Sequence, residues 1–532
     1  MFTSGTITMS WSEVVLAVVA LFLATVVCRH DLHMLQQNSY YNSRYMRFLR
    51  GSDEVTSLPR LVLLVALLFM MTTFGMLSWL PLIPAAILVA VAWLVRGRES
   101  RSKDPLKLTS RARTIYFTTL ALMFLLSVIV GIASTVGDGL RVLVALLVLS
   151  PLIMLLANLL LTPVEAFKRH RYASIAREHL QSQPRTVVIG ITGSYGKTST
   201  KHFLTRILSE HYSTLMTPGG YNTTAGVEIT IQNYLKPYHE YFVCEMGAKK
   251  GGDVKEICDI VSPRMGIITA VGEMHLETFG SIENVQRTKF ELADALPDDG
   301  FLLVNNDFPM AANRVVTNVV CRHYSVRPGN DVDYWAEDIS YSASGTDFIY
   351  CSRDGERIEL HTRLVGESNI SNLIASVAMA RHLGVPADKI RFAMLQIEPV
   401  EHRLDIKSVG GITMIDDAYN TNPIGARMAL DVLGSMKGGK RIVVTSGMIE
   451  LGDRQYELNR DLGEYIASHA DVAIVIGEYN REAILDGIRA GGMAADAVYT
   501  VSTLQEAFAV RDTLLVAGDT WLLQPQLPDT FK

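Results

Sequence analysis

Residues 187–200 read VVIGITGSYGKTST. An apolar, β-branched run leads into a glycine-rich turn, and Lys197 and Thr198 then open a predicted amphipathic helix that continues to Glu210. A strand, a glycine-rich loop and a helix N-terminus in this order form a cradle for phosphate, because backbone N–H groups and the helix dipole favour an anion there. The Lys197 ammonium would reach the outer phosphates of a nucleotide, and the Thr198 hydroxyl would ligate Mg²⁺. The stretch therefore predicts that the chain binds a nucleoside triphosphate.

This predicted phosphate loop departs from the strict Walker A pattern at one position. Ile191 stands where the first glycine would be, which leaves Thr-Gly-x-x-Gly-Lys-Thr. The residues of the loop that are expected to contact the nucleotide are Thr192, Gly193, Ser194, Tyr195, Gly196, Lys197 and Thr198.

The composition of the chain is uneven along its length. Its 532 residues suffice for about three domains. Nearly all the hydrophobic excess lies before residue 162. The cysteines show neither Cys-x-x-Cys pairing nor zinc spacing, as expected of thiols in a reducing compartment. No basic stripe interleaved with aromatic residues is present, so nucleic acid is not an expected partner.

Five apolar runs precede residue 162. Most approach the roughly 20 residues that a helix needs to cross the hydrocarbon core of a bilayer. The first run lacks a basic flank on its N-terminal side, which argues against a cleaved signal peptide. Residues 1–161 are therefore predicted to form a transmembrane module of about five helices, followed by a basic juxtamembrane linker at 162–185. The runs are 11–28, 61–80, 82–95, 114–134 and 140–161.

Basic residues gather in alternate loops of this module. They follow the first, third and fifth runs, whereas the loop near 135–141 carries only Arg141. The asymmetry predicts a multi-pass protein of the cytoplasmic membrane with its N-terminus outside and the remaining chain in the cytoplasm, where an ATP-using domain must be. Aromatic residues interleaved with arginines after the first run predict either an interfacial helix or an ordinary loop. They are Tyr40, Tyr41, Tyr45 and Phe48.

From about Thr186, strand-like runs alternate with helical patterns. Buried runs at 241–244, 265–269 and 301–304 favour a doubly wound parallel α/β sheet. Residues 332–363 alternate with period two, around turns at Ser344-Gly345-Thr346 and Asp354-Gly355, and predict a small antiparallel sheet. A second α/β pattern begins after Arg403, as in a separate Rossmann-like domain. Its predicted strands are 412–415, 441–445, 473–476 and 521–523.

Polar residues follow several of these strands. Glu245 directly follows one buried strand and is a candidate Mg²⁺ ligand, and His275 follows another. Taken alone, either residue would more often be an ordinary loop residue, and Lys289, on a predicted helix, would be a solvated lysine. Asp416, Asp417 and Asn420 end the first strand of the last domain, where they would hold a ribose or a metal, or cap the next helix.

Several motifs together resemble the Mur ligase family, whose members use ATP to join an amino acid or peptide to a carboxylate. The segments TPGGYN at 217–222 and SGMIELG at 446–452 resemble most closely the members that add D-alanyl-D-alanine to a UDP-linked muramoyl tripeptide. The resemblance covers residues 186 to about 480. It implies a central ATP-binding domain at 186–398 and a C-terminal Rossmann-like domain at 399–532. The motifs that carry the order and spacing are the phosphate loop, Glu245, His275, Lys289, Asn369-x-x-Asn372, His402-Arg403 and DDAYNTNP at 416–423.

The resemblance also implies a role for each of these residues. Thr198 and Glu245 would bind a first Mg²⁺. His275 would hold a second, helped by Lys289 carbamylated on its amine. Lys197 and the loop would bind the ATP phosphates. The resemblance also implies that Asn372 contacts the nucleotide. Arg403 would contact the γ-phosphate, and Asp417 would contact the ribose side from the last domain.

The implied reaction passes through an acyl phosphate, which an incoming amine attacks after the last domain has closed over ATP. The chain departs from the family pattern in three places. Residues 366–369 read GESN, without the family's histidine, and residues 524–529 read QPQLPD, without a Lys-Gly-Ser-like segment. The apolar module stands where the family has a UDP-sugar domain. The carboxylate substrate is therefore expected to be either a soluble UDP-linked precursor or a lipid-linked one.

Three alternatives remain beside this ligase. One keeps the chemistry but makes a capsule-type or poly-γ-linked peptide polymer. An ATP-driven transporter would need a signature such as Leu-Ser-Gly-Gly-Gln, which the sequence lacks. A catalytically silent membrane scaffold would not need Lys197, Glu245, His275 and Lys289 together.

Overall fold

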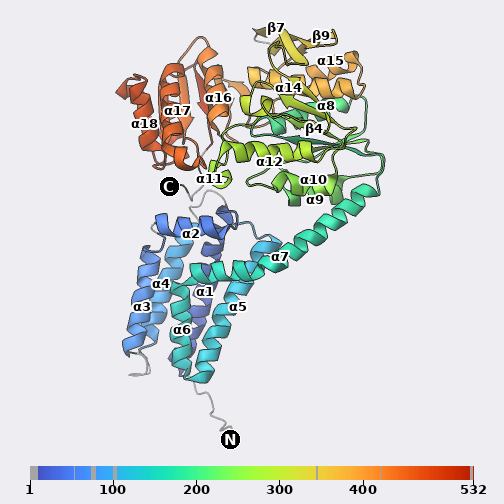
Figure 1. Ribbon diagram of the computed structural model, residues 1–532. Coiled ribbons are helices and arrows are strands. Elements are labelled where there is room, and N and C mark those ends of the chain that lie inside the picture. Colours follow the sequence, from blue (N-terminus) through green and yellow to red (C-terminus); the bar gives the residue numbers. More distant parts are fainter. Residues whose placement is uncertain are drawn as a thin grey trace. The chain divides into compact units, whose positions relative to one another are not determined.

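The computed structural model describes residues 10–52, 54–73, 79–99, 105–342, 345–419, 421–525, 527 and 531. The chain divides into two compact units, with the division between Lys168 and Arg169. The first is helical, and the second, which extends to Leu527, carries the sheets (Figure 1). Each unit has hydrophobic clusters of its own.

The first unit is a bundle of apolar helices. The bundle begins with a capping box, in which the Ser10 hydroxyl accepts the Glu13 N–H and the Glu13 side chain accepts the Ser10 N–H. Its helices are α1 (Trp11–Gln37), α2 (Asn42–Gly51), α3 (Leu58–Thr73), α4 (Leu82–Glu99), α5 (Ser110–Ala133), α6 (Val136–Val148) and α7 (Ser150–Gln181), the last of which continues into the second unit.

Among the described residues, three helices are long and apolar enough to cross a membrane, namely α1, α5 and α7. Two shorter apolar helices accompany them, α3 and α4. The predicted fifth span, 140–161, is not a single helix, because α6 ends at Val148 and α7 begins at Ser150. Pro151 lacks a backbone N–H and therefore suits the first turn of a new helix rather than the middle of a continuous one.

In the segment after α1, Tyr45 and Phe48 lie on the short helix α2, whereas Tyr40 and Tyr41 lie in the turn before it, so a helix forms over only part of this region. Tyr45 and Phe48 stack within it, with ring centroids 6.3 Å apart. The predicted linker at 162–185 is also mostly helical, since α7 extends through it to Gln181.

A buried ion pair lies inside the helical unit. Asp31 of α1 is 0% exposed and pairs with Arg60 of α3. Arg60 also donates to the Ser150 hydroxyl at 2.7 Å, and that hydroxyl in turn donates to Asp31. Three helices are thereby joined by one polar cluster among apolar side chains.

The larger sheet of the second unit has a parallel part and an antiparallel part. In the described residues it has nine strands in the order β2-β3-β1-β4-β5-β6-β7-β8-β9. The strands up to β7 pair in parallel, and β7, β8 and β9 form an antiparallel meander. The predicted parallel strands correspond to β3, β4 and β5, and the Ser344 part of the predicted turn lies outside the described residues. The bounds are β1 (Val187–Thr192), β2 (Thr214–Met216), β3 (Tyr241–Glu245), β4 (Met265–Ile268), β5 (Phe301–Asn305), β6 (Val320–Tyr324), β7 (Tyr334–Ser342), β8 (Gly345–Ser352) and β9 (Arg357–Thr362).

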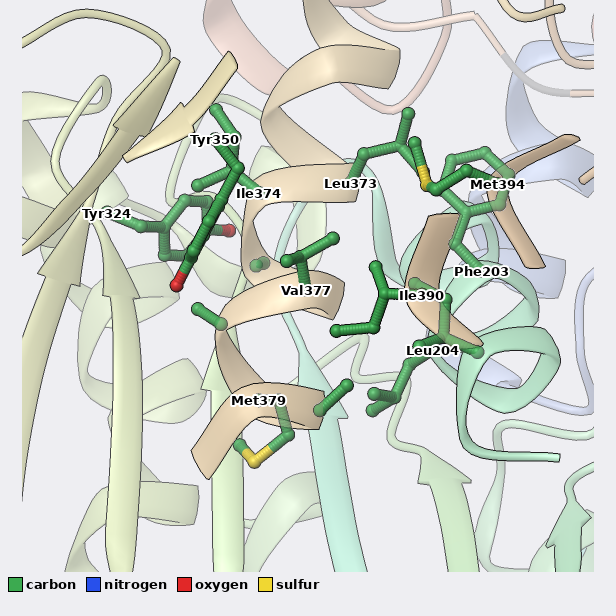
Figure 2. Packing of buried hydrophobic residues seen from close by; sticks show 14 of the residues in the cluster. Phe203, Leu204, Tyr324, Tyr350, Leu373, Ile374, Val377, Met379, Ile390 and Met394 are labelled. Carbon is green, nitrogen blue, oxygen red and sulfur yellow. The ribbon is translucent and has the colours of Figure 1, made fainter. Parts of the chain in front are cut away.

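Helices cover both faces of this sheet, as expected from strands that are apolar on both sides (Figure 1). On one face, α14 lies between Tyr324 and Tyr350 of the sheet and the side chains of α8 and α15 (Figure 2). This face carries α8 (Lys197–Leu208), α14 (Glu367–His382) and α15 (Ala387–Leu395). The other carries α9 (Thr224–Tyr234), α10 (Asp253–Val261) and α12 (Ile282–Asp294), and the short helices are α11 (Leu276–Phe279) and α13 (Pro309–Ala312).

The smaller sheet has six strands in the described residues, in the order β10-β11-β15-β12-β13-β14. Its strands are parallel except for the β10–β11 pair. They are β10 (Asp405–Val409), β11 (Ile412–Asp416), β12 (Arg441–Thr445), β13 (Val472–Ile476), β14 (Val498–Val501) and β15 (Thr520–Leu523). The helices are α16 (Pro423–Ser435), α17 (Gln455–His469), α18 (Arg481–Ala490) and α19 (Leu504–Leu514), with 3-10 turns η1 (Gly452–Arg454) and η2 (Ala495–Ala497).

Candidate active site

The predicted phosphate loop joins β1 to α8. Gly196 is the N-cap of α8 and has φ +78°, and Gly193 has φ +152°. A Cβ on Gly193 would lie 2.1 Å from the Thr269 hydroxyl oxygen and 2.9 Å from the backbone nitrogen of Ala270. Both the backbone conformation and the close packing therefore require glycine at position 193.

The side chains of the loop are bound to the segment that leads to His275. The Ser194 hydroxyl donates to the Gly272 carbonyl at 3.0 Å, and the Tyr195 hydroxyl donates to the Glu273 carbonyl at 3.1 Å. The two loops at the carboxyl ends of β1 and β4 are thus held together by direct hydrogen bonds.

Lys197 folds back over its own loop. Its ammonium donates to the carbonyl of Gly193 at 2.6 Å and to that of Ser194 at 3.3 Å. Burial lowers the pKa of Lys197 to about 8, and the nearby Glu245 carboxylate opposes this shift. An anion in the loop would give this ammonium a stronger partner than the carbonyls that it now contacts.

Glu245 ends β3 beside the loop. Its Oε1 accepts hydrogen bonds from the Thr198 hydroxyl at 3.1 Å and from the Asn222 amide at 2.9 Å. Its Oε2 lies 3.0 Å from the ammonium of Lys201, a residue whose side chain is completely buried. Burial alone would raise the pKa of Glu245, but Lys201 and Lys197 outweigh it and hold the pKa below its ordinary value. The hydroxyl of Thr198 and this ionised carboxylate are the hard oxygen donors that Mg²⁺ prefers, so these residues fit one such ion.

His275 precedes α11 and has φ +53°. Its Nδ1 is hydrogen bonded to the carboxylate of Glu450, which comes from the segment after β12. Burial lowers the pKa of His275, although Glu450 acts in the opposite direction. No three histidine, cysteine, aspartate or glutamate side chains within the described ranges lie close enough together to hold a metal ion, so Glu245 and His275 do not form such a cluster.

Lys289 is buried on α12, contrary to the solvated lysine that its position alone suggests. Only 3% of the residue is exposed, and its Nζ lies 6.0 Å from the centre of the Phe279 ring. Burial first, and the charge of Lys197 second, hold the pKa of Lys289 well below its ordinary value. A buried, neutral amine is the form of lysine that reacts with CO₂.

Asn372 of α14 contacts helix α8 just after the predicted phosphate loop. Its Oδ1 accepts a hydrogen bond from the Thr200 hydroxyl at 3.1 Å. A Cβ on Gly196 would lie 2.4 Å from the same oxygen. Asn372 is thus adjacent to the predicted nucleotide loop.

Arg403, just before β10, and Asp417, just after β11, lie at the same end of this pair of antiparallel strands. The Arg403 guanidinium lies 4.3 Å from the centre of the Tyr419 ring. The Asp417 carboxylate accepts the Leu404 N–H at 3.3 Å, and burial raises the pKa of Asp417 to about 7. Asn420 lies outside the described residues. The helix cap that was an alternative for this segment is supplied by Asn422, which accepts the Gly425 N–H at 2.8 Å.

A cavity of about 500 Å³ lies between helix α8 and the segment that contains Arg403. Thr198 and Gly219 line it from the larger sheet, and Arg403 and Tyr419 line it from the segment that leads into the smaller one. The structure therefore brings Arg403 to the same cavity as the first residues of α8.

The sequence motifs did not predict a role in the site for Lys201, Glu450 or Arg454. Lys201 is four residues from Lys197 on the same helix, a spacing that places both on adjacent turns and could have indicated it. Glu450 acts across 175 residues of sequence, which no local pattern reveals.

Comparisons with known proteins agree with this arrangement. The profile of the Mur ligase middle domain matches residues 191–380, and that of the Mur ligase glutamate ligase domain matches residues 402–527. Among solved structures, MurF from Acinetobacter baumannii has a TM-score of 0.61 at 27% identity, covering 67% of this chain and 77% of that one. MurF ligase from Thermotoga maritima in complex with ADP has a TM-score of 0.60 at 27% identity, covering 67% and 80%.

Two curated relatives are named UDP-N-acetylmuramoyl-tripeptide–D-alanyl-D-alanine ligase. The one from Bacillus subtilis is 30% identical over 295 residues, 55% of this chain and 63% of the relative, so the chain covers less than two thirds of it. The one from Escherichia coli is 30% identical over 332 residues, 62% of this chain and 69% of the relative. The chain belongs to the Mur ligase family, with the middle and C-terminal domains of that family behind a helical N-terminal region.

Proposed function

We propose that the chain is an ATP-dependent ligase that forms an amide bond between a carboxylate of a cell-wall precursor and an amine, D-alanyl-D-alanine in the first instance. The names of its relatives support the amine and the precursor. The single observation that carries the proposal is the pairing of Glu245 with Thr198 directly beside Lys197, which places oxygen ligands and a cation together at a glycine-rich loop.

In the proposed reaction, a carboxylate oxygen of the precursor attacks the γ-phosphorus of ATP. The bond to the β,γ-bridging oxygen breaks, ADP leaves, and an acyl phosphate forms. The amine nitrogen then attacks the acyl carbon and loses a proton. The bond between the acyl carbon and the phosphate oxygen breaks, and phosphate leaves with its electron pair. Lys197 and Arg403 would face the transferred phosphoryl group, where their charges stabilise the transition state.

The other residues around the loop would bind Mg²⁺ and the nucleotide. Thr198 and Glu245 would hold one Mg²⁺, and His275 with a carbamylated Lys289 would hold a second. Bound Mg²⁺ neutralises negative charge on phosphoryl oxygens. Asn372 and Asp417 would contact the nucleotide from the two domains, which requires both domains to stay in contact during the reaction.

The helical unit would anchor the enzyme in the cytoplasmic membrane, with the ligase domains in the cytoplasm. Its outer helix faces support this, since Val18, Phe117 and Ile132 are 62%, 63% and 71% exposed on apolar helices. Large exposed apolar side chains of this kind suit contact with lipid rather than water. A lipid-linked form of the precursor would then be delivered where the enzyme is.

ADP release by the detergent-purified full chain tests the proposal. The chain is given D-alanyl-D-alanine with either soluble UDP-muramoyl tripeptide or its lipid-linked counterpart. Turnover with the soluble precursor would make this an anchored form of the relatives' reaction, and turnover only with the lipid-linked form would assign substrate delivery to the helical unit. Lys197→Ala, which removes the ammonium at the loop, should abolish turnover in either case.

Absence of ADP release with both precursors would contradict the D-alanyl-D-alanine assignment. Turnover retained by Lys197→Ala would contradict the whole proposal, because the ammonium would then play no part in the reaction.

A further inference from the structure

The segments 273–277 and 450–454 meet across the two ligase domains. The Nδ1 of His275 is hydrogen bonded to the carboxylate of Glu450. The backbone N–H of Glu277 donates to the backbone carbonyl of Glu450 at 3.2 Å, and Arg454 forms an ion pair with Glu273. A short stretch of the central domain is thus held by a short stretch of the C-terminal domain at three points.

The central pair of this contact has an unusual backbone. His275 has φ +53° and Glu450 has φ +63°, a conformation that costs an ordinary residue on the order of 1 kcal/mol. Strained residues persist where the surrounding structure holds them, and they cluster at functional sites. Here the two strained residues face each other, and their side chains are only 17% and 13% exposed.

A carboxylate on one ring nitrogen of a histidine determines what the other nitrogen can do. When Nδ1 carries the proton that Glu450 accepts, Nε2 has a free lone pair that can ligate a metal ion. Such a partner also fixes the orientation of the ring and increases its basicity as a ligand. Glu450 therefore prepares His275 for ligation without itself being a ligand.

We propose that Glu450 is a positioning residue that orients His275 for the second Mg²⁺, so that this metal site is complete only when the C-terminal domain is in contact with the central domain. This inference rests on the proposed function, in which His275 holds that ion. Because coupling between two equilibria is reciprocal, the metal ion would in turn favour the closed arrangement of the domains. Because the Glu450 carboxylate belongs to the C-terminal domain, closure of that domain would complete the second Mg²⁺ site.

The test compares Mn²⁺ binding by the detergent-purified full chain and its variants, in the presence of the β,γ-methylene analogue of ATP, with free Mn²⁺ measured by electron paramagnetic resonance. Glu450→Ala removes the partner of His275. Arg454→Ala is the matched control, because it removes another contact between the same two segments without touching His275. We expect Glu450→Ala to weaken the second Mn²⁺ site about 10- to 100-fold, and Arg454→Ala to leave it within about threefold.

Glu450→Gln gives a second variant, whose amide oxygen can still accept the Nδ1 proton but carries no charge, and it should weaken the site less than Glu450→Ala. An equal loss in Glu450→Ala and Arg454→Ala would overturn the proposal, since both would then act only by holding the domains together. Unchanged Mn²⁺ binding in Glu450→Ala would also overturn it. If the unaltered chain binds ATP analogue but no second Mn²⁺, the two-metal part of the proposed function fails, and this inference fails with it.

Discussion

The ammonium of Lys201 lies 3.0 Å from the carboxylate of Glu245, and neither side chain is more than 1% exposed. Lys201 also donates to the Gly219 carbonyl at 2.6 Å, which ties the loop after β2 to the same pair. The ion pair keeps Glu245 ionised within the protein interior, and an ionised carboxylate is the form that binds a divalent cation.

Replacing Lys201 by methionine should leave Glu245 buried without its main counter-charge. Removing one partner of a buried pair costs about 3–5 kcal/mol, so the midpoint of thermal unfolding of the ligase domains should fall. The pKa of Glu245 should rise, and the Mg²⁺ concentration for half-maximal ADP release should increase. Lys255→Met is the control, because Lys255 forms an exposed pair with Asp259, and both quantities should stay at their original values. An unchanged Mg²⁺ requirement in Lys201→Met would show that Lys201 does not influence binding of the metal ion.

Lys289 should become carbamylated when CO₂ is supplied. Burial holds the pKa of this lysine well below its ordinary value and so favours the neutral amine, whose nitrogen can attack the carbon of CO₂ and lose a proton to give a carbamate. Carbon-13 NMR of the chain in ¹³C-bicarbonate should show one carbamate signal that is absent in Lys289→Ala. Lys255→Met, which removes an exposed lysine that is paired with Asp259, should keep the signal. A spectrum without a carbamate signal in the unaltered chain would contradict the prediction.

Glu228 should make the ligase domains less stable as the pH rises. The residue lies on α9, is 6% exposed, and has an Oε1 with no hydrogen-bond partner among the described residues. Burial first, and Glu256 second, raise the pKa of Glu228 from 4.5 to about 7. The folded chain therefore holds a proton between these values that the unfolded chain has released, and stability falls as the pH rises through about 7.

Glu228→Gln should remove this pH dependence. At pH 8 its thermal midpoint should exceed that of the parent by a few degrees, whereas below pH 4.5 the two should nearly coincide. Glu464→Gln, which alters an exposed glutamate on α17, should follow the parent at both pH values. A constant difference between Glu228→Gln and the parent across this range would show that Glu228 does not titrate there.

Asp31→Ala should destabilise the helical unit, because Arg60 would be left buried without its counter-charge. The expected cost is about 3–5 kcal/mol, seen as a lower midpoint of thermal unfolding in detergent. Asp31→Leu combined with Arg60→Met should recover most of the loss, since neither charge of this pair then remains buried. Asp138→Ala breaks the half-buried pair with Arg141 in the same unit and should cost less than Asp31→Ala. Equal destabilisation by the single and the double replacement would show that the charge is not the cause.

Local patterns in the sequence predicted the features that local physics determines. Short apolar runs identified β3, β4 and β5, and the glycines of residues 193–196 marked the loop between β1 and α8. The division of the run at 140–161 was missed because hydropathy does not register the helix start at Ser150. Its signal was the adjacent proline.

The parts that could not be predicted depend on contacts between distant segments. Lys289 looks like a surface lysine in sequence, and only the packing of α12 buries it. The partnership of His275 with Glu450 joins two domains, so neither residue's neighbours along the chain indicate it. Charge and burial at the site are properties of the tertiary structure, while the order of its motifs is a property of the sequence.

The tight fit of Gly193 has a consequence for how this sequence can vary. A methyl group at that position would collide with the backbone of Ala270 as well as with Thr269, and a backbone atom cannot be repacked by a compensating substitution elsewhere. Gly219 also has a positive φ, but apart from its two chain neighbours no atom of the described residues lies within 4 Å of a Cβ placed there. In a library of all single substitutions, position 193 should therefore tolerate nothing but glycine, whereas position 219 should accept asparagine, which adopts positive φ at modest cost.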